Sequence, residues 1–361
     1  MCQLEGVLTM NDSKKIVSIT MVKNECDIIE MFVRHNLKML DEMYIIDHMS
    51  TDNTMNILLN LKNEGLPIHI LKYNSYAYNQ GMLLTNFQNK LRKEKKADFI
   101  LFLDSDEFIF LNNRKEFEDS LIKEEETSYQ MYELNYLVRE GDEDKDLPLH
   151  EKITYRINQV GAFKSIINVA YHENEDIKAT EGGHYIFYNR VSDLPLKGIG
   201  PHLAHFPYRS KAQMNSKILV GGLSYIIANN SAKHGLTGAH WFDLYRKIID
   251  NGEMDEIEFA LAYNDAINAG GFTYEPLPFD SELIYLDMAN VNVLQNITNL
   301  GLNYIKHNND YRNEKELVEF LNNLDKNNEK DSIIQAVRAI EKYIMKKGIV
   351  LFNMDHLEEI Q

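Results

Sequence analysis

Short apolar runs and amphipathic helical patterns alternate through the first 110 residues of the chain. The apolar runs predict strands near residues 17–21, 44–46, 68–71 and 99–103. Between them, apolar positions that recur every three or four residues predict helices over residues 27–40, around residues 57–61 and over residues 82–96. Strands that alternate with helices through short connections are typical of a doubly wound parallel sheet. We therefore predict an α/β fold with a mostly parallel sheet flanked by helices.

The strand at 99–103 is the most apolar of these and ends in an acidic motif, Asp104-Ser105-Asp106-Glu107. Its consecutive apolar residues predict burial on both faces of the sheet. Carboxylates at the carboxyl end of such a strand lie where open α/β sheets bind ligands, and charges at a core boundary need a partner or a metal ion. Oxygen ligands of this kind suit Mg²⁺ or Mn²⁺, which also bind phosphate oxygens. The alternative is a solvated acidic turn.

Two other polar loops, 23–25 and 47–52, follow the first and second strands. Right-handed crossovers place the loops after parallel strands along one edge of the sheet. We therefore expect both loops to lie beside the acidic motif. This convergence favours a ligand site over a solvated turn.

The pattern changes after residue 110. Residues 116–126 predict a short acidic helix, 129–138 predict a strand, and 151–190 contain short strand-like pieces between polar loops. The pair Gly221-Gly222 predicts the start of a mobile loop that ends near Gly238 and orders over a bound ligand.

Apolar stripes in the last part of the chain predict helices through residues 317–324 and 333–344. We interpret these stripes as core packing against the rest of the chain. A homodimer surface and a membrane-surface helix are the alternatives, the latter because basic residues flank the final stripe.

Composition and charge narrow the class of protein. The chain has 361 residues, 44% of them hydrophobic, and a formal net charge of −17, which argues against a nucleic-acid binder. Cys2 and Cys26 cannot form a disulfide framework, so we expect a protein of the reducing cytoplasm. No run approaches about 18 apolar residues, and residues 1–15 lack the apolar core of a signal peptide.

Three segments in this order resemble the GT-A-fold, family-two-like glycosyltransferases. The segments are residues 21–25 (MVKNE), 46–54 (IDHMSTDNT) and 103–107 (LDSDE). Their order and spacing match that group, and they look especially like its bacterial branch, which acts in capsule, lipopolysaccharide or related surface-glycan assembly. Residues 205–210 (HFPYRS) also resemble a segment of that branch. The resemblance covers residues 16 to about 245. It implies metal-dependent transfer of a sugar, with inversion, from a UDP-sugar donor to a hydroxyl of a glycan or glycolipid acceptor.

With this resemblance, the chain divides into a flexible lead-in over 1–15, a catalytic domain over 16–280 and a helical C-terminal region over 281–361. Residues 16–110 are the expected nucleotide-binding half of the catalytic domain, and 111–280 are the half for the acceptor and the metal-binding histidine. The expected location is cytoplasmic, with peripheral contact at the membrane face as a variant.

The resemblance also implies residues for the donor. Those in the three segments are Val22, Asn24, Glu25, Asp47, His48, Asp52, Asp104 and Ser105. Many relatives have Asp or Asn at the position of His48 for contact with the nucleotide base, so either Asp47 or His48 takes that role here. Arg209 and Lys217 would neutralise the diphosphate.

The implied metal site combines the acidic motif with a later histidine. Asp106 would contact the metal directly, and Asp104 would contact the ribose or the metal. Glu107 would orient the sugar or support the ligands. His205 is the expected histidine, with His202 as the alternative, and a histidine ligand favours Mn²⁺ over Mg²⁺.

The general base comes from the acceptor side of the cleft in such enzymes. Glu181 fits by position, and Gly182-Gly183 gives the backbone freedom for a sugar to approach closely. His184 would orient the acceptor or support the base, and Trp241 is either a sugar platform or a core aromatic. Other acids in the region remain alternatives for the base: Glu173, Glu175 and Asp193.

Other functions are compatible with parts of the pattern. Phosphatases of the haloacid dehalogenase type place an Asp-x-Asp motif on the first strand, whereas here it follows the fourth. A nucleotidyltransferase would need a glycine-rich loop after the first strand, which Lys23-Asn24-Glu25 lacks. A non-catalytic nucleotide-sugar or glycan-binding module remains the alternative from another class.

Overall fold

The parallel part of the sheet is formed by the first four strands along the chain. The computed structural model describes residues 13–111, 113–122, 127–139, 147–172, 176–188, 192–193, 196–228, 239–252, 270–287, 291–348 and 357–360. The parallel strands lie in the spatial order β4 (Phe99–Phe102), β1 (Ile16–Val22), β2 (Glu42–Asp47) and β3 (Ile68–Tyr73). Their carboxyl ends therefore share one edge, as the sequence predicted.

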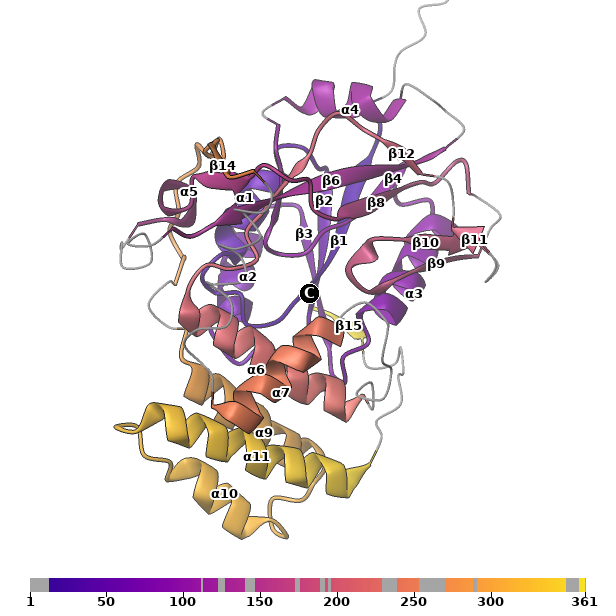
Figure 1. The fold of residues 1–361 in the computed structure, drawn as a ribbon. Coiled ribbons are helices and arrows are strands. Elements are labelled where there is room, and N and C mark those ends of the chain that lie inside the picture. The colour runs from indigo at the N-terminus through magenta and orange to yellow at the C-terminus, as the bar shows by residue number, and fades with distance from the viewer. Residues whose placement is uncertain are drawn as a thin grey trace, which may run out of the picture.

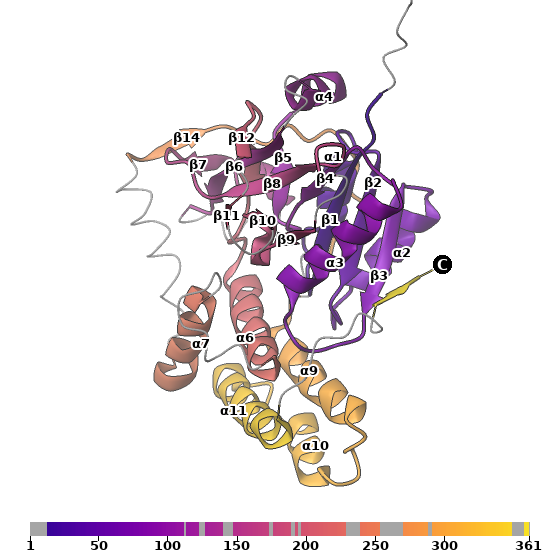
Figure 2. The same cartoon turned by 90° about the vertical axis from the view of Figure 1, so that its right-hand side faces the viewer.

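Helices cover both faces of these strands. Helices α1 (Ile29–Asn36) and α2 (Thr54–Asn63) pack on one face and α3 (Gln80–Lys93) packs on the other (Figure 2). The alternation of β1 explains this arrangement, because Ile16 and Val22 share an apolar cluster with α1 and α2. Val17, Ile19 and Met21 share another cluster with α3. The predicted α/β fold with flanking helices is confirmed.

The remaining strands continue the sheet mostly as antiparallel neighbours beyond β4. They are β8 (Phe163–Asn168), β6 (Ser128–Leu137), β7 (Tyr155–Ile157) and β14 (Phe272–Tyr274). Strand β13 (Leu203–His205) lies parallel to β6 and antiparallel to β5 (Glu107–Ile109), and β12 (Leu196–Gly198) also pairs with β6. This crossing brings His205 to the strand that begins with Glu107.

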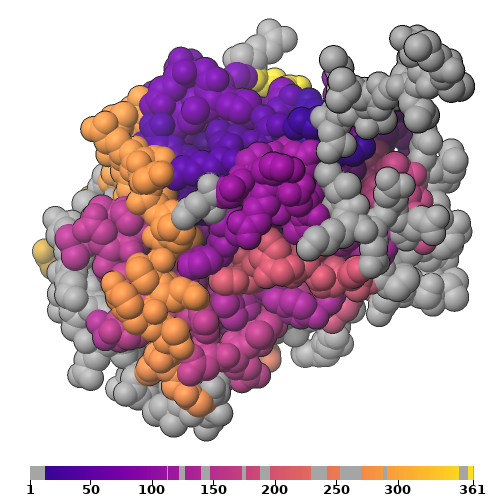
Figure 3. Space-filling view, turned by 90° about the horizontal axis from the view of Figure 1, so that it is seen from above, coloured from indigo at the N-terminus to yellow at the C-terminus, as the bar shows by residue number. Residues whose placement is uncertain are grey.

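Shorter elements surround the sheet. They are α4 (Arg114–Ile122), α5 (Leu149–Lys152), β9 (Ile177–Ala179), the 3₁₀ helix Glu181–Gly183, β10 (Ile186–Tyr188) and β11 (Ser192–Asp193), with β9, β10 and β11 forming a small antiparallel sheet. Residues 270–287 (orange in Figure 3) run along the surface from β7 to α1, where the Glu30 carboxylate accepts hydrogen bonds from the backbone of Ile284 and Tyr285.

A helical layer lies below the sheet in the view of Figure 1. Its helices are α6 (Lys211–Ile227), α7 (Ala239–Asn251), α9 (Val293–His307), α10 (Lys315–Asn322) and α11 (Glu329–Lys347). Helices α9 and α11 both pack against α6, so the layer combines elements from both sides of residue 280. After α11 the chain returns to the sheet, where β15 (Leu357–Glu359) pairs antiparallel with β3.

The prediction of a mobile loop that starts at Gly221-Gly222 is wrong for the part of this segment that the structure describes. Both glycines lie inside α6, and Gly222 is buried against the ring of Tyr245 on α7. Close helix packing, rather than a turn, explains the small residue. Residues 229–238 and the side chain of Trp241 lie outside the described part of the chain.

The apolar stripe of α11 is buried within the molecule, as core packing requires. Ile333, Val337, Ile340 and Ile344 are each 0–2% exposed. This stripe is therefore occupied by intramolecular contacts and does not face a bilayer. Among the described residues, no helix is long and apolar enough to cross a membrane.

Candidate active site

The acidic motif forms the turn between β4 and β5. Across this turn the backbone N–H of Glu107 donates to the carbonyl of Asp104 (3.1 Å), and the N–H of Asp104 donates to the Glu107 carboxylate (2.9 Å). Asp106 and Glu107 are each 1% exposed. A solvated acidic turn is therefore excluded, because buried carboxylates need compensating partners.

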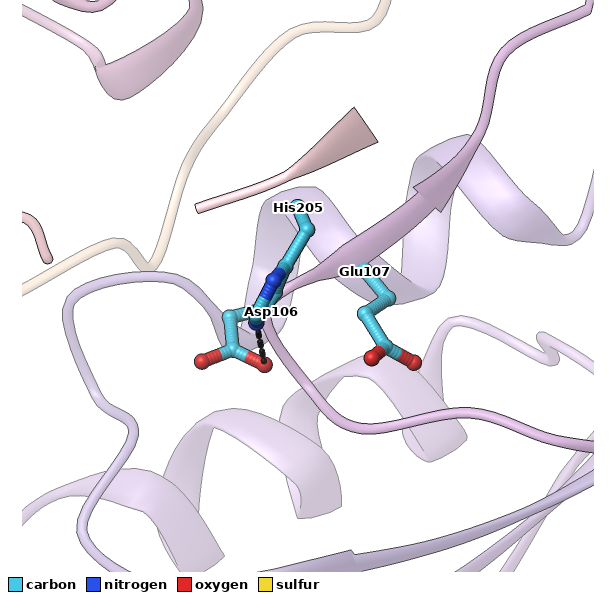
Figure 4. A group of neighbouring side chains, drawn as sticks. All are labelled: Asp106, Glu107 and His205. Carbon is cyan, nitrogen blue, oxygen red and sulfur yellow. Dashed lines mark ion pairs between the residues drawn. The ribbon is translucent and has the colours of Figure 1, made fainter. Parts of the chain in front are cut away.

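Strand pairing brings Asp106 and His205 together. His205 on β13 lies opposite Glu107 on β5, and the N–H of Phe206 donates to the carbonyl of Asp106 (2.8 Å). Nε2 of His205 lies 3.8 Å from Oδ1 of Asp106 (Figure 4). Nδ1 of His205 lies 2.8 Å from Oδ1 of Asn135. A proton on Nδ1 that donates to this oxygen leaves the lone pair of Nε2 facing Asp106.

The spacing of Asp106 and His205 in this cluster fits a divalent cation. Single ligand atoms of Asp106, Glu107 and His205 lie within 4.8 Å of one another. With bonds of about 2.1 Å, adjacent ligands of an octahedral ion are about 3 Å apart and opposite ligands about 4.2 Å apart. The separation of 3.8 Å between Asp106 and His205 falls in this range. His202, the alternative ligand, instead stacks on Phe110, with ring centroids 4.6 Å apart.

Basic side chains surround the buried acids. Nζ of Lys217 lies 2.8 Å from Oδ2 of Asp106. The Arg209 guanidinium is 3% exposed and donates to Asp27 (2.6 and 2.9 Å) and Glu25 (2.5 Å). Burial alone would raise the pKa of Asp106, but the neighbouring positive charges, Lys217 first, hold it below its usual value. Any contact of Arg209 with a diphosphate would have to compete with these carboxylates.

Lys164 on β8 completes the acidic site and was not among the sequence candidates. Its side chain is 1% exposed, and its Nζ lies 2.5 Å from Oδ2 of Asp104 and 3.1 Å from Oε1 of Glu107. Nζ of Lys164 also donates a hydrogen bond to the carbonyl of Gly182 (2.6 Å). Burial is the largest influence on the pKa of Asp104 and raises it, but the charge and the hydrogen bond of Lys164, together with His184, outweigh burial and the pKa is lowered. The available signal was a lysine at an inward-facing position of an apolar strand.

Glu181 lies on a tight turn that is tied to Asp104. Gly182 and Gly183 have φ of 71° and 65°, and a Cβ on Gly183 would lie 2.3 Å from the Cβ of Phe102. The amide of Gln80 links the two parts, because its Oε1 accepts from the Gly182 N–H (2.8 Å) and its Nε2 donates to Asp104 (2.9 Å). The structure thus places the turn beside the acidic motif.

The carboxylate of Glu181 has a tyrosine partner from the helical layer. Tyr225 on α6 donates its hydroxyl hydrogen to Oε2 of Glu181 (3.1 Å), and its ring stacks on Tyr78, with centroids 4.6 Å apart. His184 faces β8 and β6, with Nδ1 2.7 Å from the carbonyl of Phe163 on β8 and 3.8 Å from Glu133 on β6. The alternative bases Glu173 and Glu175, and the side chain of Asp193, lie outside the described residues.

Asp47 and His48 at the end of β2 lie in different surroundings. Asp47 lines a cavity of about 500 Å³ at the carboxyl ends of β2 and β3. Burial raises the pKa of its carboxyl group, which accepts from the N–H of Ser50 (3.3 Å). His48 is buried beside Tyr73 and Tyr78 (ring centroids 5.7 and 6.3 Å), and burial lowers its pKa well below the usual value. Asp47 is therefore the one that faces the cavity.

The other residues that the sequence predicts to bind the nucleotide-sugar donor lie in or beside the loops around this cavity. Oδ1 of Asn24 accepts from the N–H of Thr51 (2.7 Å), and Asn24 itself has a positive φ of 59°. Oδ1 of Asp52 accepts from the N–H of Thr54 (2.9 Å). Val22 and Ser105 are buried at the ends of β1 and β4, at 1% and 3% exposure. These contacts fix the loops after β1 and β2 relative to one another.

Comparisons with known proteins gave partial likenesses of fold. No protein-family model and no curated protein matches the chain. A structure of GalNAc-T7 with UDP, GalNAc and Mn²⁺ is 10% identical and covers 72% of this chain and 55% of its own, with a TM-score of 0.36. Glucosyl-3-phosphoglycerate synthase from Mycobacterium tuberculosis, with Mn²⁺, UDP and glucosyl-3-phosphoglycerate, is 17% identical and covers 34% of this chain and 44% of its own, with a TM-score of 0.25. The chain thus spans about half the length of these proteins.

Proposed function

We propose that this protein is a metal-dependent glycosyltransferase that moves a sugar from a nucleoside-diphosphate sugar, a UDP-sugar, to an acceptor hydroxyl. The proposal rests on one observation. The side chains of Asp106 and His205 lie close together at the edge of the sheet where the parallel strands have their carboxyl ends. This cluster lies on the same edge as the cavity lined by Asp47. Open α/β sheets bind their ligands at that edge.

Asp106 and His205 would hold the cation, with Glu107 as the third group within reach. A carboxylate and an imidazole together favour Mn²⁺, with Mg²⁺ as the alternative. The cation would neutralise the charge that develops on the leaving diphosphate. Lys217, one-third exposed beside Asp106, is placed to add positive charge at the same point.

The dimensions of the edge suit a nucleoside diphosphate. Strands β2 and β4 both pair with β1, so their ends lie about 10 Å apart at the usual strand spacing. In the proposed arrangement the diphosphate lies at Asp106 and the nucleoside in the cavity at Asp47. Asp104 is held by Lys164 and Gln80, so we assign it to the ribose and sugar rather than to the metal.

Glu181 is the proposed general base for inversion. It would take the proton from the acceptor hydroxyl as that oxygen attacks the sugar carbon from the face opposite the diphosphate. Tyr225 orients the carboxylate through its hydroxyl group, and His184 on the same turn would contact the acceptor. A glycan or glycolipid is the proposed acceptor, on the basis of the sequence resemblance to enzymes of surface-glycan assembly.

The test is release of nucleoside diphosphate from a panel of UDP-, GDP- and CDP-sugars with Mn²⁺, with and without a chelator. We expect release from a UDP-sugar that depends on the metal. Asp106→Asn should weaken Mn²⁺ binding at least about tenfold, because it removes a charged ligand. Asp119→Asn on the surface of α4 is the matched control and should leave binding unchanged.

Other outcomes would identify the alternatives. Binding of a UDP-sugar without turnover towards any acceptor or water would indicate a non-catalytic binding module. Release of pyrophosphate from UTP would indicate a nucleotidyltransferase. Absence of binding to every nucleotide in the panel would refute the proposal.

A further inference from the structure

The cavity at Asp47 has a second wall that comes from the helical layer. One side is built by the β2 loop and the end of β3, including Asp47, Ser50 and Lys72. The opposite side is built by Asn303 and by Lys306 and His307, all on α9. These α9 residues are exposed and recur at spacings of three and four, so they share one face of the helix. The cavity is thus shared between the sheet and a helix about 250 residues later.

Buried polar contacts hold α9 in this position. Asn296 is 3% exposed, donates to Oγ of Ser216 on α6 (3.0 Å) and contacts the hydroxyl of Thr51 in the β2 loop (3.4 Å). Nearer the cavity, the ring of Tyr76 packs edge-on against Tyr304, with centroids 5.5 Å apart. A helix fastened at both points presents its exposed face to the cavity in a fixed orientation.

We propose that α9 is part of the donor site and that Asn303 and His307 contact the nucleoside. This inference rests on the proposed function and extends it to the helical layer, for which the sequence indicated no role in binding the donor. The lining of this one cavity combines an acid, Asp47, with amide, imidazole and lysine groups. A uracil ring presents one N–H group between two carbonyl oxygens. A carboxylate can accept from that N–H, and side-chain donors beside it can bind the two carbonyl oxygens. A volume of about 500 Å³ also falls in the usual range for small-molecule sites.

The experiment measures binding of UDP, with Mn²⁺ present, by isothermal titration calorimetry of the full chain. Asn303→Ala and His307→Ala should each weaken UDP binding about fivefold, the effect of one lost hydrogen bond. Gln295→Ala is the matched control, because Gln295 is an exposed amide on the same helix away from this cavity. Binding of pyrophosphate with Mn²⁺ should be unchanged in all variants, since α9 faces the nucleoside end.

The outcomes separate this inference from the proposed function. If the unmodified protein binds UDP but the two variants bind it equally well, the role of α9 is wrong and the proposed function stands. An equal loss in Gln295→Ala, or a parallel loss of pyrophosphate binding, would also overturn it, because either result indicates a general disturbance of the helix. If the unmodified protein binds neither UDP nor pyrophosphate, the proposed function itself fails.

Discussion

Lys164 lies at the centre of a charge network that no local sequence motif reveals. Its partners Asp104 and Glu107 are about 60 residues away along the chain, and Gly182 is 18 residues away. A motif such as Asp-x-Asp is local and could be recognised from the sequence. The pairing of a lysine with that motif depends on the antiparallel contact of β8 with β4, which periodicity alone does not determine.

Replacing Lys164 by Met should destabilise the protein through Glu107. This carboxylate is 1% exposed and would lose its cation, a change that typically costs about 3 kcal/mol. The double variant Lys164→Met/Glu107→Gln removes the charge as well, so it should recover at least about half of that loss. Urea unfolding of the two single variants and the double variant measures the coupling. Strictly additive losses would show that the two residues do not interact.

Buried His35 should make stability depend on pH. It is 0% exposed and its Nε2 lies 2.8 Å from the carbonyl of Ile109, whereas Nδ1 has no hydrogen-bond partner among the described residues. Burial lowers its pKa to about 4. Between pH 6.5 and 4 the unfolded chain therefore binds more protons, and stability falls as the pH falls, by up to about 3 kcal/mol.

The variant His35→Gln keeps a donor for Ile109 but cannot take up a proton. It should lose this part of the pH dependence, while the contribution of the carboxylates remains the same in both proteins. Unfolding free energies at pH 7, 6, 5 and 4 provide the measurement. Parallel curves for the two proteins would contradict the assignment.

At the scale of elements, regular periodicity was sufficient to predict structure. The pattern of 99–103 gave β4, and that of 82–96 gave α3, because each element buries residues at its own repeat. Gly221-Gly222 was misleading for a physical reason. Glycine favours turns in isolation, but here a contact with Tyr245 of another helix decides the conformation, and a single sequence does not contain that contact.

The two glycines of α6 allow a paired test of that explanation. A Cβ on Gly222 would lie 2.2 Å from Cδ2 of Tyr245, so Gly222→Ala should cost about 1–3 kcal/mol by overpacking. A Cβ on Gly221 meets nothing within 4 Å, so Gly221→Ala should stabilise the helix by up to about 1 kcal/mol. Thermal and urea unfolding distinguish the two. Stabilisation by both substitutions would mean that α6 and α7 are not closely packed.

At the scale of the whole molecule, the helical layer was predicted as helices but not as a partner of the sheet. The stripe of α11 indicates burial, but not which surface buries it; in the structure α6 and α9 do so. The return of β15 to the edge of β3 was also not predicted, because three residues carry too little pattern. Long-range pairings of this kind decide how the candidate site is closed.

The last strand should protect the edge of the sheet without supporting the helical layer. Directly after β15 the N–H of Ile360 donates to the carbonyl of Ile70 (2.8 Å), and within β15 Leu357 pairs with Tyr73. Removing residues 357–361 leaves the β3 groups unpaired, so hydrogen exchange over 68–73 should accelerate about tenfold. Exchange over α11 should not change, because its buried stripe packs on other helices.

A side-chain variant serves as the control for this deletion, because it distinguishes loss of the backbone pairing from loss of a surface charge. Glu359 lies 3.1 Å from His69, and Glu359→Ala removes this contact while leaving the backbone pairing intact. Because exposed ion pairs contribute little, exchange over β3 in this variant should match that of the unmodified protein. If exchange over α11 rises together with that over β3 in the deletion, the two layers unfold as one cooperative unit. The donor cavity between β2 and α9 would then depend on the last strand as well.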